Sequence, residues 1–162
     1  MRQGMMVAVL VCTAQVAAAQ ELSVDRQIVR QCFENTEIGA LYPPCLGQAS
    51  GQCQDQPGGS TTIGITECIL AETAEWDAIL NEEYRATQQA NEAADTGGQS
   101  PVMDRSDALR DAQRAWIAFR DADCGARYAM WQDGTIRTIV GANCTLTMTA
   151  QRAIDLRDMR GN

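Results

Sequence analysis

The sequence predicts an all-α fold: a small disulfide-stapled helical bundle, built on a long antiparallel helix pair with a C-terminal helix. Three observations support this prediction. Apolar residues recur at steps of three and four over most of residues 66–160, and only residues 135–140 have the β-branched density of a strand. Six cysteines follow an apolar N-terminal segment. The length of 162 residues allows one domain of ordinary size.

Residues 1–19 have the composition of a secretory signal peptide. They contain one positive charge at Arg2, an apolar run over residues 5–12 and three alanines that end at Ala19. We therefore expect cleavage before Gln20 and a secreted or periplasmic protein. The apolar run is too short to span a bilayer, and no later segment has the pattern of a membrane span.

The mature chain has an even number of cysteines: Cys32, Cys45, Cys53, Cys68, Cys124 and Cys144. In an exported chain such a set is typical of three disulfides. Six cysteines allow 15 pairings, and the sequential pairing is the simplest of them. A metal site made of cysteines alone is the competing interpretation, but the sequence has no Cys-x-x-Cys pair to form one. We therefore expect neither a metal nor a cofactor.

The first third of the mature chain predicts short helices. Apolar residues at helical spacing over residues 23–37 follow Ser23, which is a plausible N-cap. Pro43 and Pro44 interrupt the chain, and residues 45–53 have room for one or two helical turns before the breaker-rich segment 56–60. We expect residues 20–52 to form an N-terminal helical extension that is held more by cysteines than by a core.

The remaining chain predicts three longer helices. The first runs from Thr66, as its N-cap, to about residue 94, and its apolar residues recur at steps of three and four. Ser100 and Pro101 are then the expected N-cap and first residue of a return helix that runs to about residue 131. A final helix is expected over residues 142–160.

Two strings in the long helices carry most of the aromatic and paired polar residues. The expected hydrophobic seam between the helices consists of Trp76, Leu80, Trp116 and Phe119. The expected polar edge of the seam consists of Asp77, Asn81, Tyr84, Gln113, Arg120 and Asp121. An ion pair between Asp77 and Arg120 would fix the helix register, because the guanidinium group binds a carboxylate through two hydrogen bonds.

At these strings the chain resembles the LprI-like lysozyme inhibitor family. The string D..LN..Y is matched by Asp77, Leu80, Asn81 and Tyr84, and L..AQRAW..FRD..C by Leu109, residues 112–116, residues 119–121 and Cys124. A closing cysteine and T..R...L are matched by Cys144, Thr149, Arg152 and Leu156. The resemblance implies an LprI-like helical domain over residues 53–162. Many members have only the last four cysteines, and a glycine- and serine-rich loop that is common between the last two is reduced here to Gly134 and Thr135.

The composition excludes several function classes. Histidine and lysine are absent, so a Ser-His or Cys-His pair, a Schiff-base lysine and a P-loop lysine are excluded. The formal net charge is −8, and removal of Arg2 with the signal peptide leaves 12 arginines against 21 acids, a charge of −9. An acidic chain lacks the positive field that nucleic-acid binding needs.

We therefore expect a binding protein and not an enzyme. The resemblance implies an inhibitor, with a basic protein such as lysozyme as partner and blocking of its cleft as the mode of action. The best-placed binding loops are residues 56–62, with Gly58, Gly59 and Ser60, and residues 132–137, with Asp133, Gly134 and Thr135. One alternative is an envelope structural or interaction protein with a helical docking surface. Another is a hydrolase that uses a carboxylate pair such as Glu82 with Glu83 or Asp121 with Asp123.

Overall fold

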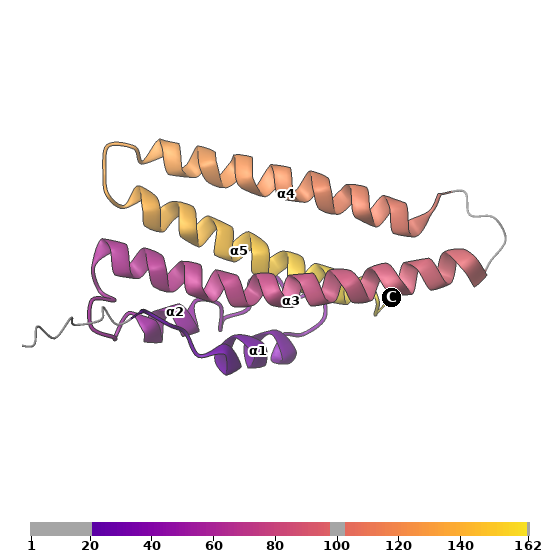
Figure 1. Cartoon of the computed structure of the whole chain (residues 1–162), viewed down its shortest axis with the longest axis horizontal. Helices are drawn as coiled ribbons and strands as arrows, with labels where there is room; N and C mark the ends of the chain where they lie inside the picture. The colour runs from indigo at the N-terminus through magenta and orange to yellow at the C-terminus, as the bar shows by residue number, and fades with distance from the viewer. Residues whose placement is uncertain (1–20, 98–102, 162) are drawn as a thin grey trace, which may run out of the picture.

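The computed structural model describes residues 21–97 and 103–161, so the predicted signal peptide lies outside the described residues. The described residues form the helices α1 (Arg26–Asn35), α2 (Gln48–Cys53), α3 (Thr62–Gly97), α4 (Arg105–Met130) and α5 (Arg137–Asp158), as Figure 1 shows. They contain no strand. The prediction of an all-α, disulfide-stapled bundle is therefore confirmed.

Helix α5 lies in the centre of the bundle. It runs between α4 on one side and α3 on the other, while α1 and α2 cover the opposite side of α3 (Figure 1). Its fully buried residues Ala150 and Ala153 have small side chains, which let neighbouring helices approach closely. The main packing partner of α3 is thus α5, and α3 meets α4 less extensively. The expected antiparallel pair is present, but its two helices share α5 as a common neighbour.

The core is one continuous cluster of buried apolar side chains. The largest of these is Trp76, which has no exposed surface and meets the ring of Phe33 edge-on, with centroids 6.2 Å apart. Others on α3 and α5 are Ile69, Ile79, Leu80, Leu146, Ile154 and Leu156. Phe119 was expected in this seam, but 61% of its surface is exposed. The reason is that α5 covers only one side of α4, and Phe119 lies on another.

Helices α1 and α3 begin at caps other than those expected. Asp25, and not Ser23, caps α1, because its Oδ1 accepts a hydrogen bond from the Gln27 amide at 2.8 Å. Helix α3 begins about one turn before Thr66, and the hydroxyl of Thr61 accepts from the amide of Gly64 at 2.9 Å. Thr66 lies inside the helix, where its hydroxyl donates to the carbonyl of Thr62.

The starts of α4 and α5 also differ from the prediction. The N-cap of α4 is Asp104, whose carboxylate accepts from the Asp107 amide; Ser100 and Pro101 lie outside the described residues. The Ser106 hydroxyl and the Asp107 amide donate to Asp104 and lower the pKa of its carboxyl group. Helix α5 begins at Arg137, so the β-branched segment 135–140 is mostly helical. Tertiary packing here outweighs intrinsic propensity.

Three disulfides hold the chain in a sequential pairing. Cys32 is bonded to Cys45, Cys53 to Cys68 and Cys124 to Cys144. The first closes the loop between α1 and α2, the second joins α2 to α3, and the third joins α4 to α5. Every helix is therefore held by at least one covalent link to another part of the described chain.

A buried glutamate attaches α2 to α3. Glu72 is 1% exposed, and its carboxylate accepts from the amides of Gly47 and Ser50 at 2.8 and 2.7 Å and from the Trp76 indole at 3.3 Å. Gly47 is the N-cap residue of α2 and provides no side-chain cap. The carboxylate therefore satisfies amides that the helix start would leave unpaired, and these charge-assisted bonds offset the cost of burying its charge.

Candidate functional site

The two loops that were expected to bind a partner lie at the same end of the bundle. Helix α3 begins there, α4 ends there and α5 begins there (Figure 1). We call residues 54–63 together with residues 130–138 the loop end. A groove of about 360 Å³ runs between its two halves, with walls from residues 61–63 and from Thr135, Arg137 and Thr138. The hydroxyl of the wall residue Thr138 lies 2.9 Å from that of Thr66 on α3.

Large apolar side chains are exposed at the loop end. Ile63, in the first turn of α3, is 71% exposed, and Met130, at the end of α4, is 82% exposed. Trp131 and Ile136, at the two ends of the α4–α5 loop, are each about half exposed. Single exposed apolar residues are ordinary, but several of them at one end of a bundle are typical of a surface that binds a partner.

The backbone of the α4–α5 loop is fixed by Arg137. Its Nε donates to the hydroxyl of Tyr128, and its Nη1 donates to the carbonyls of Gln132 and Gly134 at 2.8 and 3.4 Å. Its guanidinium also lies over the Tyr128 ring, 5.7 Å from the centroid. A loop held in this way loses little conformational entropy when it binds a partner.

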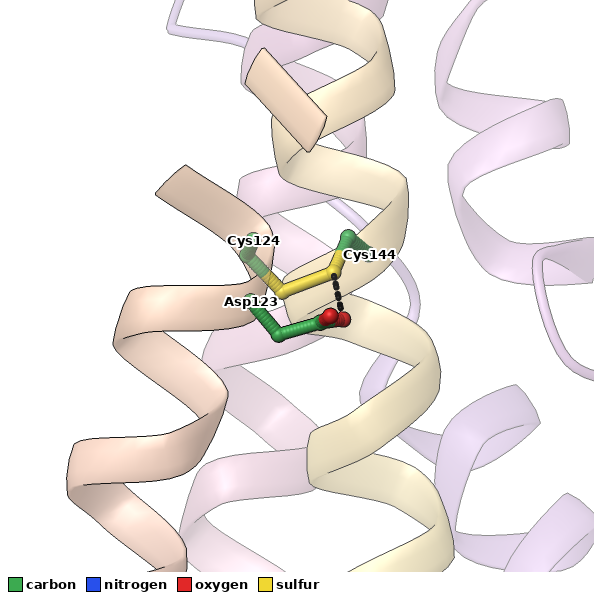
Figure 2. A group of neighbouring side chains, drawn as sticks. All are labelled: Asp123, Cys124 and Cys144. Carbon is green, nitrogen blue, oxygen red and sulfur yellow. Dashed lines mark hydrogen bonds between the residues drawn. A yellow bond between two sulfur atoms is a disulfide. The ribbon is translucent and has the colours of Figure 1, made fainter. Parts of the chain in front are cut away.

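A disulfide joins α4 and α5, the two helices that this loop connects. Figure 2 shows Cys124 of α4 bonded to Cys144 of α5, with the carboxylate of Asp123 beside it, 3.9 Å from the Cys144 sulfur. The Met148 sulfur lies 3.7 Å from that of Cys124. The ligand atoms of Asp123, Cys124 and Cys144 are close enough together to suggest a metal site. Metal binding requires free thiolates, which a disulfide does not provide, and Asp123 is already paired with Arg127 at 2.8 Å.

The glycine-rich half of the loop end is packed and does not protrude. Gly59 is buried, and a Cβ added there would lie 2.7 Å from the Cys53 carbonyl oxygen. A Cβ at Gly64 would lie 2.1 Å from the carbonyl oxygen of Gly58, whose φ of +87° also favours glycine. Gly59 therefore packs against the end of α2, and Gly64 lets the start of α3 approach Gly58, while Ser60 and the neighbouring Ile63 remain exposed.

The other half of the loop end is more open. Asp133 and Thr135 are exposed, and Gly134 is half-buried. Asp133 and two further exposed carboxylates, Asp55 and Glu67, lie on or beside the loop end. The surface thus combines apolar side chains with negative charge.

The family-motif residues have structural positions away from the loop end. Trp76 and Leu80 are buried in the core, Tyr84 is packed against it, and Asn81 is exposed and donates to Asp77 on its own helix. The Asp77–Arg120 ion pair does not form, because Arg120 is paired with the adjacent Asp121 at 2.8 Å.

Helices α4 and α5 are instead joined by a buried hydrogen bond. Arg152 Nε donates to Gln113 Oε1 at 2.8 Å, and both residues are buried. The ring of Trp116 lies next to this bond, with the Arg152 and Arg120 guanidinium groups 5.9 and 5.0 Å from its centroid.

Each acid of the two carboxylate pairs considered for hydrolysis is bound to an arginine. Glu82 is paired with Arg30, and Glu83 with Arg160. The Arg30 guanidinium holds the pKa of Glu82 below its ordinary value. A glycosidase acid needs a raised pKa, so this environment is the opposite of the one required. Asp121 and Asp123 are paired with Arg120 and Arg127.

Sequence reasoning missed Ile63, Met130 and Ile136 as surface residues. Each lies beside a breaker or at a helix end, where an apolar residue fits a core position as well as an exposed one. The helix order could have shown that these residues lie near one another. In consecutive antiparallel helices, the start of the first, the end of the second and the start of the third lie at the same end of the bundle.

Comparison with known proteins agrees with the resemblance in the sequence. The family model for the lysozyme inhibitor LprI matches residues 53–156, which is more than half of the chain. An uncharacterized protein of Rhizobium meliloti (strain 1021) is 29% identical over 121 residues, which cover 71% of this chain and 86% of that protein. No solved structure matches the chain.

The matched segment begins at Cys53 and ends at Leu156, so it contains two of the disulfides and nearly all of α3, α4 and α5. Among the residues that the structure describes, no helix has the length and apolar character needed to cross a bilayer. The disulfides are consistent with an extracytoplasmic protein. By its family match, the chain belongs to the LprI lysozyme inhibitor family.

Proposed function

We propose that this protein inhibits a basic lysozyme outside the cytoplasm, and that the loop end is the surface that covers the lysozyme cleft. Membership of the family supports the inhibitory role. The observation that carries the choice of surface is the group of exposed apolar side chains at the loop end, above all Trp131 and Met130. Binding energy in protein interfaces is concentrated in a few such residues, of which tryptophan is among the most frequent.

The electrostatic part of the proposal rests on net charge. The mature chain, after cleavage before Gln20, carries a formal charge of −9. Lysozymes of the animal type are strongly basic, so the long-range field brings the two proteins together and increases the association rate. The exposed carboxylates at the loop end place part of this charge at the contact surface itself.

An assay of cell-wall clearing tests the inhibitory role. A basic lysozyme is added to a turbid suspension of bacterial cell walls at low salt, with and without an excess of the purified protein. We expect the protein to slow the clearing, and we expect a weaker effect at higher salt, where the field is screened. Unchanged clearing at low salt would contradict the proposal and favour the envelope interaction protein.

Variants test the surface. Replacing Met130 and Trp131 together by alanine should raise the inhibitor concentration for half-inhibition by about tenfold or more, the loss typical of a binding hot spot. The matched control is Phe119→Ala, which removes an exposed aromatic side chain from the middle of the same helix. An equal loss in both variants would assign binding to another surface.

The site of action is tested separately. We expect the purified mature protein to begin at Gln20 and to be recovered from the periplasm or the medium. N-terminal sequencing of the protein from each fraction measures this. An intact Met1 in a cytoplasmic fraction would contradict the localisation.

A further inference from the structure

A second cavity lies further along α5 than the groove of the loop end and shares no wall residue with it. It has a volume of about 170 Å³ and lies between α4, α5 and the segment that connects α1 to α2. Its walls include Tyr42 from that segment, Trp116 from α4, and Met148, Gln151, Arg152 and Asp155 from α5. The amide of Tyr42 donates to Gln151 Oε1 at 3.1 Å, so the connecting segment is held against the cavity.

Arg152 is a buried cation with unused hydrogen-bonding capacity. The residue is 8% exposed, and its Nε donates to Gln113. Its Nη2 has no hydrogen-bond partner among the described residues and is enclosed by protein, so a ligand in the cavity reaches this atom after a small shift of the surrounding side chains. Nearby Arg157 is different, because its Nε, Nη1 and Nη2 donate to Asp158 and to the backbone carbonyls of residues 33, 36 and 37.

The surroundings do not neutralise Arg152 fully. Burial lowers the pKa of Arg152, and the carboxylate of Asp155 opposes this effect. Asp155 accepts a hydrogen bond from Gln151 Nε2 at 2.9 Å, but no salt bridge joins it to Arg152 within the described chain. A second cation, Arg120, lies on the Trp116 ring beside the cavity.

We propose that this cavity is a binding site for a small carboxylate group, which accepts hydrogen bonds from the guanidinium of Arg152. A planar guanidinium is the side chain best suited to hold a carboxylate, and a buried cation that forms no salt bridge is costly. Trp116 and Met148 provide apolar walls for the carbon atoms of the ligand. The volume admits a group of a few heavy atoms, such as the end of a peptide or an acidic side chain.

The test uses acetate as the probe and the indole N–H of Trp116 as the reporter. In a nitrogen–proton correlation spectrum of the purified protein the signal is assigned with Trp116→Phe. We expect acetate to shift this signal saturably and to leave the indole signals of Trp76 and Trp131 in place. Sodium chloride at the same ionic strength is the control. The absence of a saturable shift up to about 100 mM acetate, or an equal shift with chloride, would overturn the proposal.

Two variants examine the role of charge. Arg152→Met should abolish the acetate shift, and a retained shift in the folded variant would overturn the proposal. Because this substitution removes a buried hydrogen bond, Asp155→Asn provides an independent measurement on a half-buried residue. It removes a like charge beside the ligand, so we expect acetate to bind about threefold more tightly. Unchanged or weaker binding in Asp155→Asn would also contradict the proposal.

Two larger probes distinguish the sources of the carboxylate. N-acetylalanine presents the carboxylate of a chain terminus, and N-acetylglutamate amide presents that of an acidic side chain. Tighter binding of either one than of acetate supports the site and identifies its source. Failure of both to compete with acetate would overturn the assignment to a peptide carboxylate. The lysozyme assay is independent of this site, because the cavity and the loop end share no wall residue.

Discussion

Helices α1 and α2 form a layer, and helices α3, α4 and α5 form a bundle. The two regions are stabilised by different kinds of interaction. The bundle buries a continuous set of apolar side chains, including Ile154 and Leu156, which have no exposed surface. The layer contributes few buried apolar residues, chiefly Val29 and Phe33. It is attached to the bundle by the Cys53–Cys68 disulfide, by the buried carboxylate of Glu72 and by the guanidinium of Arg157, while the Cys32–Cys45 disulfide lies within the layer.

This difference shows how a short segment can be fixed without a core of its own. Arg157 donates to the carbonyls of Phe33 and Thr36 at the end of α1, where a helix leaves carbonyls unpaired and favours a cation. At the start of α2, the carboxylate of Glu72 accepts hydrogen bonds from backbone amides that the helix leaves unpaired. Both ends of the layer are thus bound through helix termini, and we expect the layer to open under conditions that leave the bundle folded.

The largest effect is expected for Trp76→Ala, because this side chain contacts both regions. Its ring packs against Phe33 of the layer, and its indole donates to Glu72. Truncation should lower the free energy of unfolding by about 3–5 kcal/mol, through lost burial and an internal cavity. Urea unfolding followed by circular dichroism measures it. A loss below about 1 kcal/mol would show that the two regions do not share this contact as a common core.

Removal of the disulfide between the two regions is the next largest perturbation. The double variant Cys53→Ala with Cys68→Ala releases a link with a sequence separation of 15 residues, which contributes about 3 kcal/mol on the chain-entropy estimate. We expect amide hydrogen exchange to accelerate mainly in α1 and α2. The matched control, Cys124→Ala with Cys144→Ala, should instead accelerate exchange around the α4–α5 loop. The same exchange pattern in both variants would contradict the separation of layer and bundle.

Glu72→Gln tests the charge at the start of α2. The amide side chain keeps one oxygen acceptor but loses the charge and one of the acceptor positions, so we expect a loss of about 1–3 kcal/mol. Thermal unfolding measures the effect, with Glu67→Gln as a control at an exposed position on the same helix. A more stable Glu72→Gln variant would show that the desolvation free energy of the buried charge exceeds the stabilisation from its three hydrogen bonds.

The helical fold was predictable because its periodic signal is long, whereas the helix ends were not. Ser23 and Asp25, like Thr61 and Thr66, are chemically equivalent candidates for a cap, and local sequence does not choose between them. The extra turn of α3 depends on the close approach of Gly64 to Gly58, which is a tertiary contact. The apolar stripe of α4 was recognised, but how much of it α5 covers depends on packing.

The candidate sites were predictable in part. The order of the helices implies that the two loops meet, and both loops were identified from breakers. That Gly59 packs inward and Ile63 faces outward follows from backbone geometry that has no local sequence signal. The cavity at Arg152 was beyond sequence reasoning, because it requires the segment around Tyr42 to fold back over α5.

The smallest effect is expected at Arg30 and Glu82, one of the surface ion pairs between layer and bundle. Arg30 of α1 donates to both carboxylate oxygens of Glu82 on α3 at 2.7 and 3.1 Å, but both side chains are more than 40% exposed. Solvent screening therefore limits the cost of Glu82→Gln to about 0.5 kcal/mol at neutral pH and low salt.

The pH dependence of this variant has a definite sign. The hydrogen bond from Arg30 lowers the pKa of Glu82 below its ordinary value of 4.5, so the folded state favours the ionised form. The stabilisation is complete above that value and is lost as the pH falls through the lower pKa of the folded state. Urea midpoints of the wild type and Glu82→Gln should therefore differ at pH 7 and converge under acid or at high salt. The exposed residue Glu92 offers the matched control Glu92→Gln, and an equal effect there would assign the loss to net charge instead of to the bond between α1 and α3.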